Sequence, residues 1–348
     1  MSKVVRAIEL GFGTNSVVVD TKHGRPIIRT FPSVVNKKVT GLDDFGAAFS
    51  GTKKTVTVDV DGIHYEVGED ATVNSAGDMR VLNDNYVNST QYKALMLGSL
   101  YMIHSDEIDV LALGLPANHW QRRDEAKELA IGEHKYPCGR VIKVKNAIVF
   151  PQPVAGLLTY VNSLGQDAYE NSFKEQTTVS IDPGYFTFDF ALAKGLRIDS
   201  TRSGAVNQGV SVILKDIQKE LSEAFSLTQF PIDIIDAALW KTPGEIKVHG
   251  EKYPFPKCTG KTLSGEDTDV TFDVTKQLEH APRAAATELR NVIGDGADID
   301  LFIGLGGPIS HYLGAIKEAY PRHKFVVLDN PITAVAEGLY YGALQATK

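Results

Sequence analysis

The strongest constraint on the fold is a short motif that occurs twice, about half a chain apart. Glu9-Leu10-Gly11-Phe12 and Asp182-Pro183-Gly184-Tyr185 both read acid-x-Gly-aromatic directly after an apolar, strand-like run in a chain of 348 residues. A strand that ends in a carboxylate and turns through glycine brings backbone N–H groups and a negative charge to one point. The repetition predicts two related halves that face a shared ligand.

Chain length also favours two lobes. A chain of 348 residues exceeds what one hydrophobic core usually supports. We expect an α/β protein whose first lobe covers residues 1–165 and whose second lobe covers 175–330. A C-terminal helix within 331–348 is expected to return to the first lobe.

The pattern of apolar residues predicts strands and helices that follow a similar course in both halves. Period-2 runs indicate strands, and i, i+3, i+4, i+7 runs indicate amphipathic helices. The first half is predicted to contain strands Val4–Leu10, Asn15–Asp20 and a run to Ile28, a hairpin Thr55–Val60 and Ile63–Val67, a helix Tyr92–His104, a strand Asp109–Gly114, a helix after Trp120, a strand Val141–Val149 and a helix through Val154–Val161. The second half is predicted to contain strand Thr178–Asp182, helices Val210–Leu221 and Val274–Ile293, strand Asp298–Ile303, helix Ile309–Tyr320, strand Lys324–Leu328 and a helix from Pro331.

Two further segments could contribute to a ligand site. Gly304-Leu305-Gly306-Gly307-Pro308 lies between a predicted buried strand and a helix, where missing side chains let an anion approach backbone N–H groups at a helix N-terminus. Gln152 lies between Pro151 and Pro153 at the start of a helix, so its amide could orient a water molecule. The alternative for this segment is an ordinary helix start.

Two other segments imitate nucleotide motifs and are rejected. Gly11-x-Gly13 suggests a dinucleotide-binding fold, but Ser16 replaces the third glycine and the chain continues as a strand. Gly260-Lys261-Thr262 resembles the end of a P-loop, but Phe255 stands where that motif needs its first glycine. We expect the second segment to be a surface loop.

Composition excludes several other classes. The net charge of −7 opposes direct contact with DNA, so any link to DNA is expected to pass through a partner. No apolar run approaches the ~20 residues of a membrane span, and the first residues do not resemble a secretory signal. The two cysteines, Cys138 and Cys258, cannot form a disulfide framework, and the histidines lack zinc-ligand spacing. We expect a soluble, cytoplasmic protein without a structural metal.

In their order along the chain, these segments resemble those of the actin-like ATPases, which have a duplicated ribonuclease H-like fold with a nucleotide cleft between two lobes. The resemblance is closer to the plasmid-segregation branch called ParM or StbA, which includes PRTRC system protein D. It covers nearly the whole chain. The matching segments are Glu9–Ser16, Phe31-Pro32-Ser33, Tyr65-x-Val67-Gly68, Gly114-Leu115-Pro116, Gln152–Gly156, Asp182–Asp189, Gly304–Gly307 and the helix Asn330–Gly338.

The resemblance implies that ATP and Mg²⁺ bind between the lobes. Glu9 and Asp182 would hold the metal through water, and Gln152 would position the attacking water, so these three form the implied catalytic set. Further implied features are self-association into filaments and a DNA-binding adaptor protein that couples them to plasmid segregation. The implied nucleotide contacts are Gly11, Phe12, Gly13, Thr14 and Asn15 in the first turn; Gly184, Tyr185, Phe186 and Thr187 in the second; Gly304, Gly306, Gly307 and Pro308 at the adenosine; and Gln218, Lys219 or Asp199 at the base or ribose.

Two departures from the family pattern leave alternatives open. Glu9 stands where relatives usually have Asp, and Ser16 stands where many have Lys. Hydrolysis could therefore be slow, and a non-hydrolysing scaffold that uses nucleotide only to set its shape is the main alternative. A monomeric small-molecule kinase of the same superfamily would need a catalytic Asp and a sugar-binding insertion, for which no candidate is visible. The preference between ATP and GTP stays open.

Overall fold

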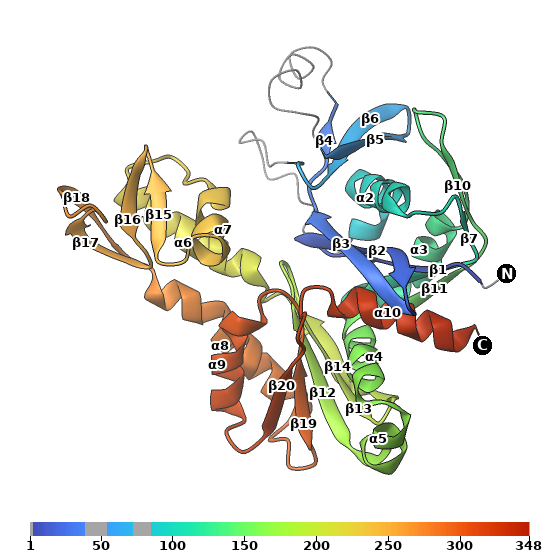
Figure 1. The fold of residues 1–348 in the computed structure, drawn as a ribbon. Helices are drawn as coiled ribbons and strands as arrows, with labels where there is room; N and C mark the ends of the chain where they lie inside the picture. Colours follow the sequence, from blue (N-terminus) through green and yellow to red (C-terminus); the bar gives the residue numbers. More distant parts are fainter. Residues whose placement is uncertain (1–2, 39–53, 72–84, 348) are drawn as a thin grey trace.

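A computed structural model describes residues 3–38, 54–71 and 85–347. Residues 1–2, 39–53 and 72–84 of the expected first lobe, and Lys348, lie outside the described residues. Two five-stranded sheets form the centres of two lobes, and the small β-rich part of the second lobe projects away from its sheet (Figure 1).

The first sheet has the strand order β11-β8-β1-β2-β3. Strand β1 (Val5–Leu10) pairs antiparallel with β2 (Thr14–Lys22), which pairs antiparallel with β3 (Arg25–Pro32). On its other side β1 pairs parallel with β8 (Val110–Leu115), and β8 pairs parallel with β11 (Ala147–Pro151). The meander predicted at the N-terminus is confirmed; β1 begins one residue later than expected, and β2 and β3 extend beyond their predicted ends.

The second sheet repeats this arrangement in the order β14-β13-β12-β19-β20. Strand β12 (Thr177–Pro183) pairs antiparallel with β13 (Phe188–Lys194), which pairs antiparallel with β14 (Arg197–Val206). Strand β12 also pairs parallel with β19 (Leu301–Gly304), followed by β20 (Lys324–Val327). The two sheets therefore share strand order and direction, as the repeated motif predicts.

The register of the two hairpins is also the same. Glu9 lies opposite Ser16 across β1 and β2, and Asp182 lies opposite Asp189 across β12 and β13. Each acidic residue thus occupies the end of the central strand of its sheet, directly before the turn. The duplicated sequence motif corresponds to a duplicated position in space.

Two helices cross between the sheets (Figure 1). Helix α4 (Gln152–Leu164) packs against β12, and α10 (Ala334–Ala346) packs against β1 and β8. A Cβ atom placed on Gly338 would lie 1.7 Å from the carbonyl oxygen of Ala155, and Thr159 Oγ1 donates a hydrogen bond to Ala334 O at 2.6 Å. The two helices therefore approach each other closely, and α10 returns the chain to the first sheet.

Smaller elements complete the first lobe. Helix α2 packs against β1 and β2, and a short 3₁₀ helix follows β8. The predicted strand Val141–Val149 is wrong as a single element, because the structure divides it into β10 and β11, which belong to different sheets. The bounds are β4 (Asn36–Lys37), β5 (Thr55–Val60), β6 (Ile63–Gly68), α2 (Thr90–Met102), β7 (Glu107–Ile108), the 3₁₀ helix Ala117–Arg122, α3 (Arg123–Ala130), β9 (Gly132–Lys135) and β10 (Val141–Val144).

The second lobe carries helices on its sheet and two hairpins at its outer end (Figure 1). The predicted amphipathic face of Val210–Leu221 is confirmed, since its five apolar residues are all buried. Gly260 and Lys261 are the last two residues of strand β17, and Thr262 is buried. The expectation of a surface loop at this segment is therefore wrong. The bounds are α5 (Gln166–Asn171), α6 (Val210–Ala224), α7 (Ile232–Trp240), β15 (Glu245–Val248), β16 (Glu251–Pro254), β17 (Lys257–Lys261), β18 (Asp267–Asp273), α8 (Thr275–Ile293) and α9 (Ile309–Ala319).

Apolar side chains gather in three clusters: one in each lobe and one between them, where α4 and α10 meet. Each fully buried Leu, Ile, Val or Phe contributes ~1.5–3 kcal/mol to stability. Among the described residues, no helix is long and apolar enough to cross a membrane.

Candidate functional site

A cavity of about 280 Å³ lies where the two lobes meet. Both acid-x-Gly turns contribute to its wall, together with the start of α4, the glycine loop before α9 and the segment before α10. The lining residues are Glu9, Gly11, Phe12, Gly13, Thr14 and Ser16; Gln152; Asp182, Pro183, Gly184, Tyr185, Thr187 and Asp189; Val210, Asp236 and Trp240; Gly306, Gly307 and Pro308; and Pro331, Ile332 and Val335.

The first turn is held from behind by the first lobe. Ser33 Oγ and Tyr86 OH both donate hydrogen bonds to the carbonyl oxygen of Gly11, the second at 3.2 Å. A Cβ atom on Gly11 would lie 2.6 Å from Thr14 O, so the turn requires glycine there. The turn is thus fixed through the carbonyl group of Gly11, and the close approach of Thr14 O leaves no room for a side chain at Gly11.

The second turn is joined to the start of α6. Gly184 N–H donates to Thr187 O at 2.7 Å and closes the hairpin. The N–H groups of Val210 and Ser211, at the start of α6, donate to the carbonyl oxygens of Gly184 and Tyr185 at 3.1 and 2.7 Å. First-turn N–H groups of a helix have no partner within it, and here the turn supplies those partners. The turn and α6 therefore form one hydrogen-bonded unit.

The aromatic position of each motif makes contact across the two lobes. Phe12 stacks on Tyr86 with ring centroids 4.5 Å apart and meets Phe186 edge-on at 5.0 Å. A Cβ atom on Gly13 would lie 2.7 Å from Tyr185 Cβ. The side chain of Phe186, a residue whose backbone was predicted to contact phosphate, packs against the first-lobe core and does not line the cavity. Asn15, another predicted contact, is fully buried and also lies outside the lining.

Besides Asp236, three carboxylates face the cavity, and burial raises the pKa of each of these three. The pKa of Glu9 rises to about 8, opposed in part by a hydrogen bond from Ser16. The pKa of Asp189 rises to about 6, opposed by hydrogen bonds from Thr187 and from Ala117 N–H at 2.8 Å. The pKa of Asp182 rises well above its usual range through burial and the nearby negative charges of Glu9 and Asp189. No Lys or Arg stands among the described lining residues, so a cation here would be strongly favoured.

The raised pKa of Glu9 predicts a specific pH dependence of stability. A carboxyl group whose folded pKa lies above its unfolded value stabilises the fold at low pH, and this contribution is lost as the pH rises through about 8. Without ligand, we expect the melting temperature to fall between pH 5.5 and 8.5 by clearly less in Glu9→Gln than in the wild type. Thermal melts across this range measure the effect, with Glu251→Gln on an exposed strand as the control. Parallel curves for Glu9→Gln and wild type would contradict the assignment.

Gln152 lines the cavity as the first residue of α4 and is 6% exposed. Gly114, at the end of β8, lies beside it: a Cβ atom on Gly114 would be 3.3 Å from Gln152 Cγ. The Gly-Leu-Pro strand end therefore leaves room for the glutamine side chain. Its amide is positioned to act on a group bound in the cavity.

The glycine loop before α9 closes against the second turn. Gly306 has a φ of +81°, and a Cβ atom there would lie 2.4 Å from Asp182 Oδ1 and 2.5 Å from Pro183 O. Gly306, Gly307 and Pro308 line the cavity as predicted from the sequence. Gly304 does not, because it is the last residue of β19 and lies against Ile309.

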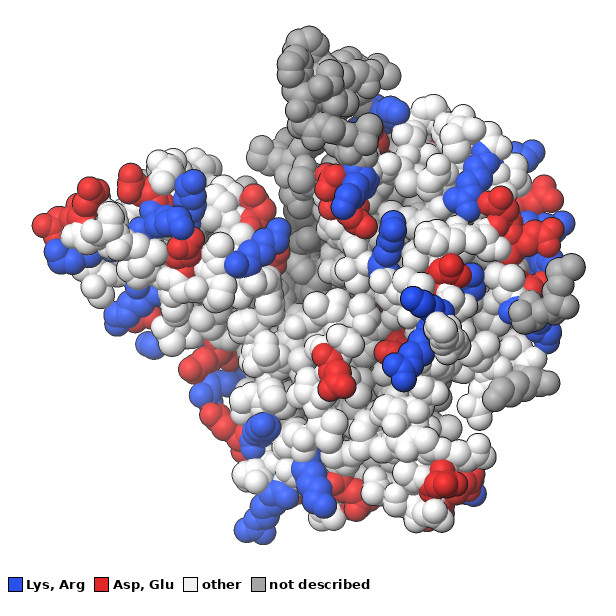
Figure 2. Space-filling view, in the orientation of Figure 1, with Lys and Arg blue, Asp and Glu red and all other residues white. Residues whose placement is uncertain are grey.

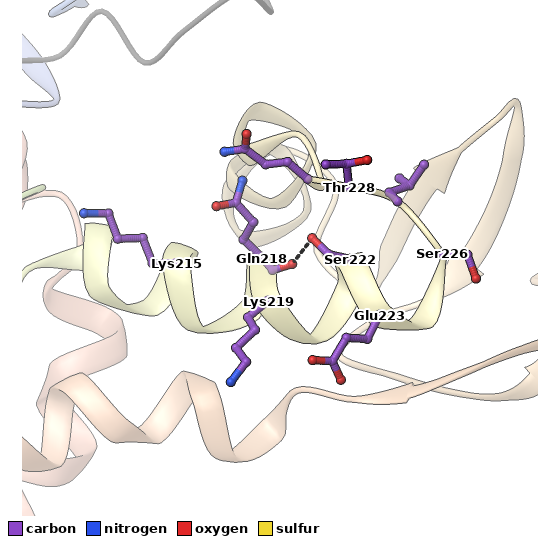
Figure 3. A pocket seen from close by; sticks show the side chains of 9 residues that line it. Lys215, Gln218, Lys219, Ser222, Glu223, Ser226 and Thr228 are labelled. Carbon is purple, nitrogen blue, oxygen red and sulfur yellow. Dashed lines mark hydrogen bonds between the residues drawn. The ribbon is translucent and has the colours of Figure 1, made fainter.

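The residues proposed for the base or ribose lie elsewhere. Figure 3 shows Gln218 and Lys219 in a separate, open depression on α6, where Ser222 Oγ donates to Gln218 O at 2.7 Å. Asp199 lies on β14 and accepts hydrogen bonds from Thr201. The structure does not bring these three residues to the cavity. Gln218 and Lys219 lie more than two helical turns beyond the start of α6, the end of the helix that is bonded to the second turn.

Several lining residues were missed by the sequence analysis. Asp236 and Trp240 come from α7, a helix that was not predicted, and Ile332 comes from the segment before α10. The run Ile232–Trp240 is apolar at helical spacing and follows Pro231, which was the available signal. Asp189 was also missed, although its place opposite Asp182 follows from the hairpin register.

In the described part of the chain, no group of three His, Cys, Asp or Glu side chains is arranged to hold a metal ion by itself. A cation near Glu9 and Asp182 would need further oxygen ligands from water or from a bound phosphate. Mg²⁺ commonly binds in this way, through one or two carboxylates and a substrate phosphate. The donor set of this cavity therefore fits Mg²⁺ held through water.

The N-terminal part of the chain matches a family model of known proteins. Residues 7–154 match the family model described as the actin like proteins N terminal domain. A sequence search of curated proteins gave no match.

Solved structures resemble the whole chain. A non-polymerisable quadruple mutant of pCBH ParM is 20% identical, with a TM-score of 0.74 over 99% of this chain and 100% of that one. A ParM subunit of a 15-stranded filament from Clostridium botulinum is 18% identical, with a TM-score of 0.72 over 99% and 100%. An archaeal actin homologue in complex with ADP is 17% identical, with a TM-score of 0.73 over 98% and 99%. At these identities, the likeness shows a shared fold.

Proposed function

Because the chain has the actin-like fold and its residues 7–154 match the N-terminal domain of actin-like proteins, we propose that it is a filament-forming ATPase. It binds Mg²⁺ and ATP between its lobes, in the cavity where the two turns converge. The observation that carries this proposal is that convergence: Gly11, Gly184 and Gly306 bring backbone to one cavity beside Glu9 and Asp182.

The chain's own residues account for the steps of binding and hydrolysis. Glu9 and Asp182 would hold the waters of the metal, and backbone N–H groups of both turns would receive the phosphates. A bound Mg²⁺ would supply positive charge that neutralises the phosphates. Gln152 orients the attacking water from its buried place at the start of α4. No covalent enzyme intermediate is needed.

The absence of a cationic side chain from the described lining makes this cavity depend strongly on the metal. In Ser16 the first turn has a hydroxyl that donates to Glu9, so it lowers the pKa of that carboxyl and adds no charge. Nucleotide without Mg²⁺ would bring four negative charges to three carboxylates. We therefore expect ATP binding to require the divalent cation.

Filament formation is supported by two of the similar structures, a ParM filament and a ParM variant made unable to polymerise. We propose that this chain polymerises with nucleotide in the cytoplasm and that a DNA-binding adaptor couples the filament to plasmid DNA. The face in Figure 2 has Lys and Arg interspersed with Asp and Glu and shows no extended basic area. An adaptor therefore fits this face better than direct DNA contact does.

The test is pelleting with parallel measurement of phosphate release. Purified protein is incubated with Mg²⁺ and ATP, ADP or a non-hydrolysable analogue, and each sample is repeated with a chelator. ATP-dependent pelleting with phosphate release is the expected result. Polymer without phosphate release would support the non-hydrolysing scaffold, and phosphate release without polymer at any concentration would support a monomeric ATPase or kinase.

Gln152→Ala separates binding from hydrolysis. Because the amide acts only on the attacking water, we expect phosphate release to fall about a hundredfold while ATP affinity stays within about threefold. Single-turnover phosphate release and equilibrium binding measure the two quantities. Gln229→Ala, on the separate depression of α6, is the matched control. Equal losses in affinity and rate would mean that Gln152 serves binding only.

A further inference from the structure

The mouth of the cavity differs in chemistry from its floor. The floor has the three carboxylates and the glycine turns, whereas the mouth has Trp240 and Ile332, whose exposed fractions are 37% and 53%. Exposed apolar side chains that border a polar cavity commonly mark the place of an apolar part of a ligand. The cavity is therefore built for a molecule with a charged end and a flat or apolar end.

The glycine loop fixes the order of these parts. Gly306 lies against Asp182 at the floor, since a Cβ atom on Gly306 would be 2.4 Å from Asp182 Oδ1. A Cβ atom on the next residue, Gly307, would lie 3.5 Å from Ile332 Cγ1 at the mouth. Two consecutive glycines thus span the distance from the carboxylates to the apolar rim. A ligand that places phosphates at the floor reaches the rim with its other end.

Trp240 is held at this rim by a second ring. It is the last residue of α7, and its ring meets that of His311 on α9 edge-on, with centroids 4.5 Å apart. Burial lowers the pKa of His311, so the imidazole is neutral at pH 7 and the contact is aromatic. The indole is therefore braced while part of its surface remains open. A braced, partly open indole is a suitable surface for stacking a flat ring.

Asp236 stands one helical turn before Trp240 on α7, and both side chains line the cavity. Residues four positions apart lie on the same helix face. The carboxylate thus lies on the same side of α7 as the indole, and its oxygens can accept hydrogen bonds from hydroxyl groups of a bound ligand. This pair offers stacking and hydrogen-bond acceptance at one place.

We propose that Trp240 and Asp236 form the nucleoside end of the cavity, with a purine base stacked on the indole and the ribose hydroxyls bonded to the carboxylate. This assignment rests on the proposed function and replaces the expectation that Gln218, Lys219 or Asp199 would bind this part. Purines give a larger stacking area than pyrimidines, so purine nucleotides are preferred. The selection acts through the ring, while the two turns bind phosphate irrespective of the base.

Tryptophan fluorescence provides the first test, because the chain has only two tryptophans. In Trp120→Phe protein, the remaining emission reports Trp240 alone. Saturable quenching is expected with Mg²⁺ and ATP or GTP, weaker quenching with CTP, and none with Mg²⁺ and tripolyphosphate. Calorimetry with tripolyphosphate measures phosphate binding independently of the ring.

Substitutions provide the second test. We expect Trp240→Ala to lower ATP affinity about tenfold or more, and Trp240→Phe to stay within about threefold, while both bind tripolyphosphate as the wild type does. Asp236→Asn is expected to remove the preference for ATP over its 2′-deoxy analogue. Circular dichroism checks that each variant is folded.

The outcomes separate the two proposals. ATP binding that leaves Trp240 emission unchanged and survives Trp240→Ala would overturn the base platform and leave the nucleotide site intact. If neither ATP nor tripolyphosphate binds with Mg²⁺, the proposed function and this assignment both fail. Equal losses of ATP and tripolyphosphate affinity in Trp240→Ala would show that Trp240 supports the cavity wall and does not select the ring.

Discussion

Asp182→Ala is expected to weaken binding of Mg²⁺ and ATP about a hundredfold and to abolish nucleotide-dependent pelleting. Asp182 is 7% exposed, lies against Gly306 at the end of β12, and is one of the two carboxylates proposed to hold the metal. Loss of a carboxylate that orders a metal site typically costs 10–100-fold or more in affinity. Calorimetric titration with Mg²⁺ and ATP measures this loss, and sedimentation measures the polymer.

The same substitution has the opposite effect on the ligand-free protein. Asp182 is buried close to the charges of Glu9 and Asp189, which raise its pKa, and removing it relieves that repulsion. We expect Asp182→Ala to melt at or above the wild-type temperature at pH 8, so lost binding would not reflect misfolding. Asp269→Ala, an exposed residue on β18, should bind nucleotide as the wild type does. Wild-type affinity in Asp182→Ala would refute the proposed site.

Gly338→Ala is expected to destabilise the protein by ~3 kcal/mol or more. Its new Cβ atom would lie 1.7 Å from the backbone oxygen of Ala155, and backbone cannot move aside as a flexible side chain can. Helices α4 and α10 would have to separate, with loss of the hydrogen bond between Thr159 and Ala334 O. Urea unfolding measures the change in the free energy of unfolding.

The chain offers a matched control for this prediction. Gly314 is also helical, in α9, and a Cβ atom there meets nothing within 4 Å. Gly314→Ala is therefore expected to stabilise the protein by about 0.5–1 kcal/mol, since alanine favours a helix and glycine does not. Similar unfolding free energies for the two variants would show that the crossing of α4 and α10 is looser than described.

The duplicated fold could be predicted because its signal lies in short, local patterns. The acid-x-Gly turns and the apolar strands before them specified both central strands, and the five apolar positions of Val210–Leu221 specified α6. The small outer part of the second lobe could not be predicted. Its strands β15 and β16 are only four residues long, too short for a period of two to be recognised.

The floor of the candidate site was more predictable than its mouth. Glu9, Asp182 and Gly306 lie at the ends of strands of two sheets, and such strand ends converge. Trp240 and Asp236 lie at the cavity through tertiary packing that no local pattern encodes, such as the contact between the rings of Trp240 and His311 on α9. Phe186 and Asn15 were assigned to the ligand from the resemblance, which does not show that their side chains pack into the protein, since alternate side chains of a hairpin point to opposite faces.

Because hydrogen bonds join the second turn to the start of α6, a movement of the turn would move the helix with it. Its 15 residues extend about 22 Å at 1.5 Å per residue, from the cavity floor toward the outer hairpins of the lobe. A rotation of about 5° at the turn would move the far end of such a rod by about 2 Å. Binding or loss of one phosphate group at the turn would in this way shift the outer hairpins of the second lobe.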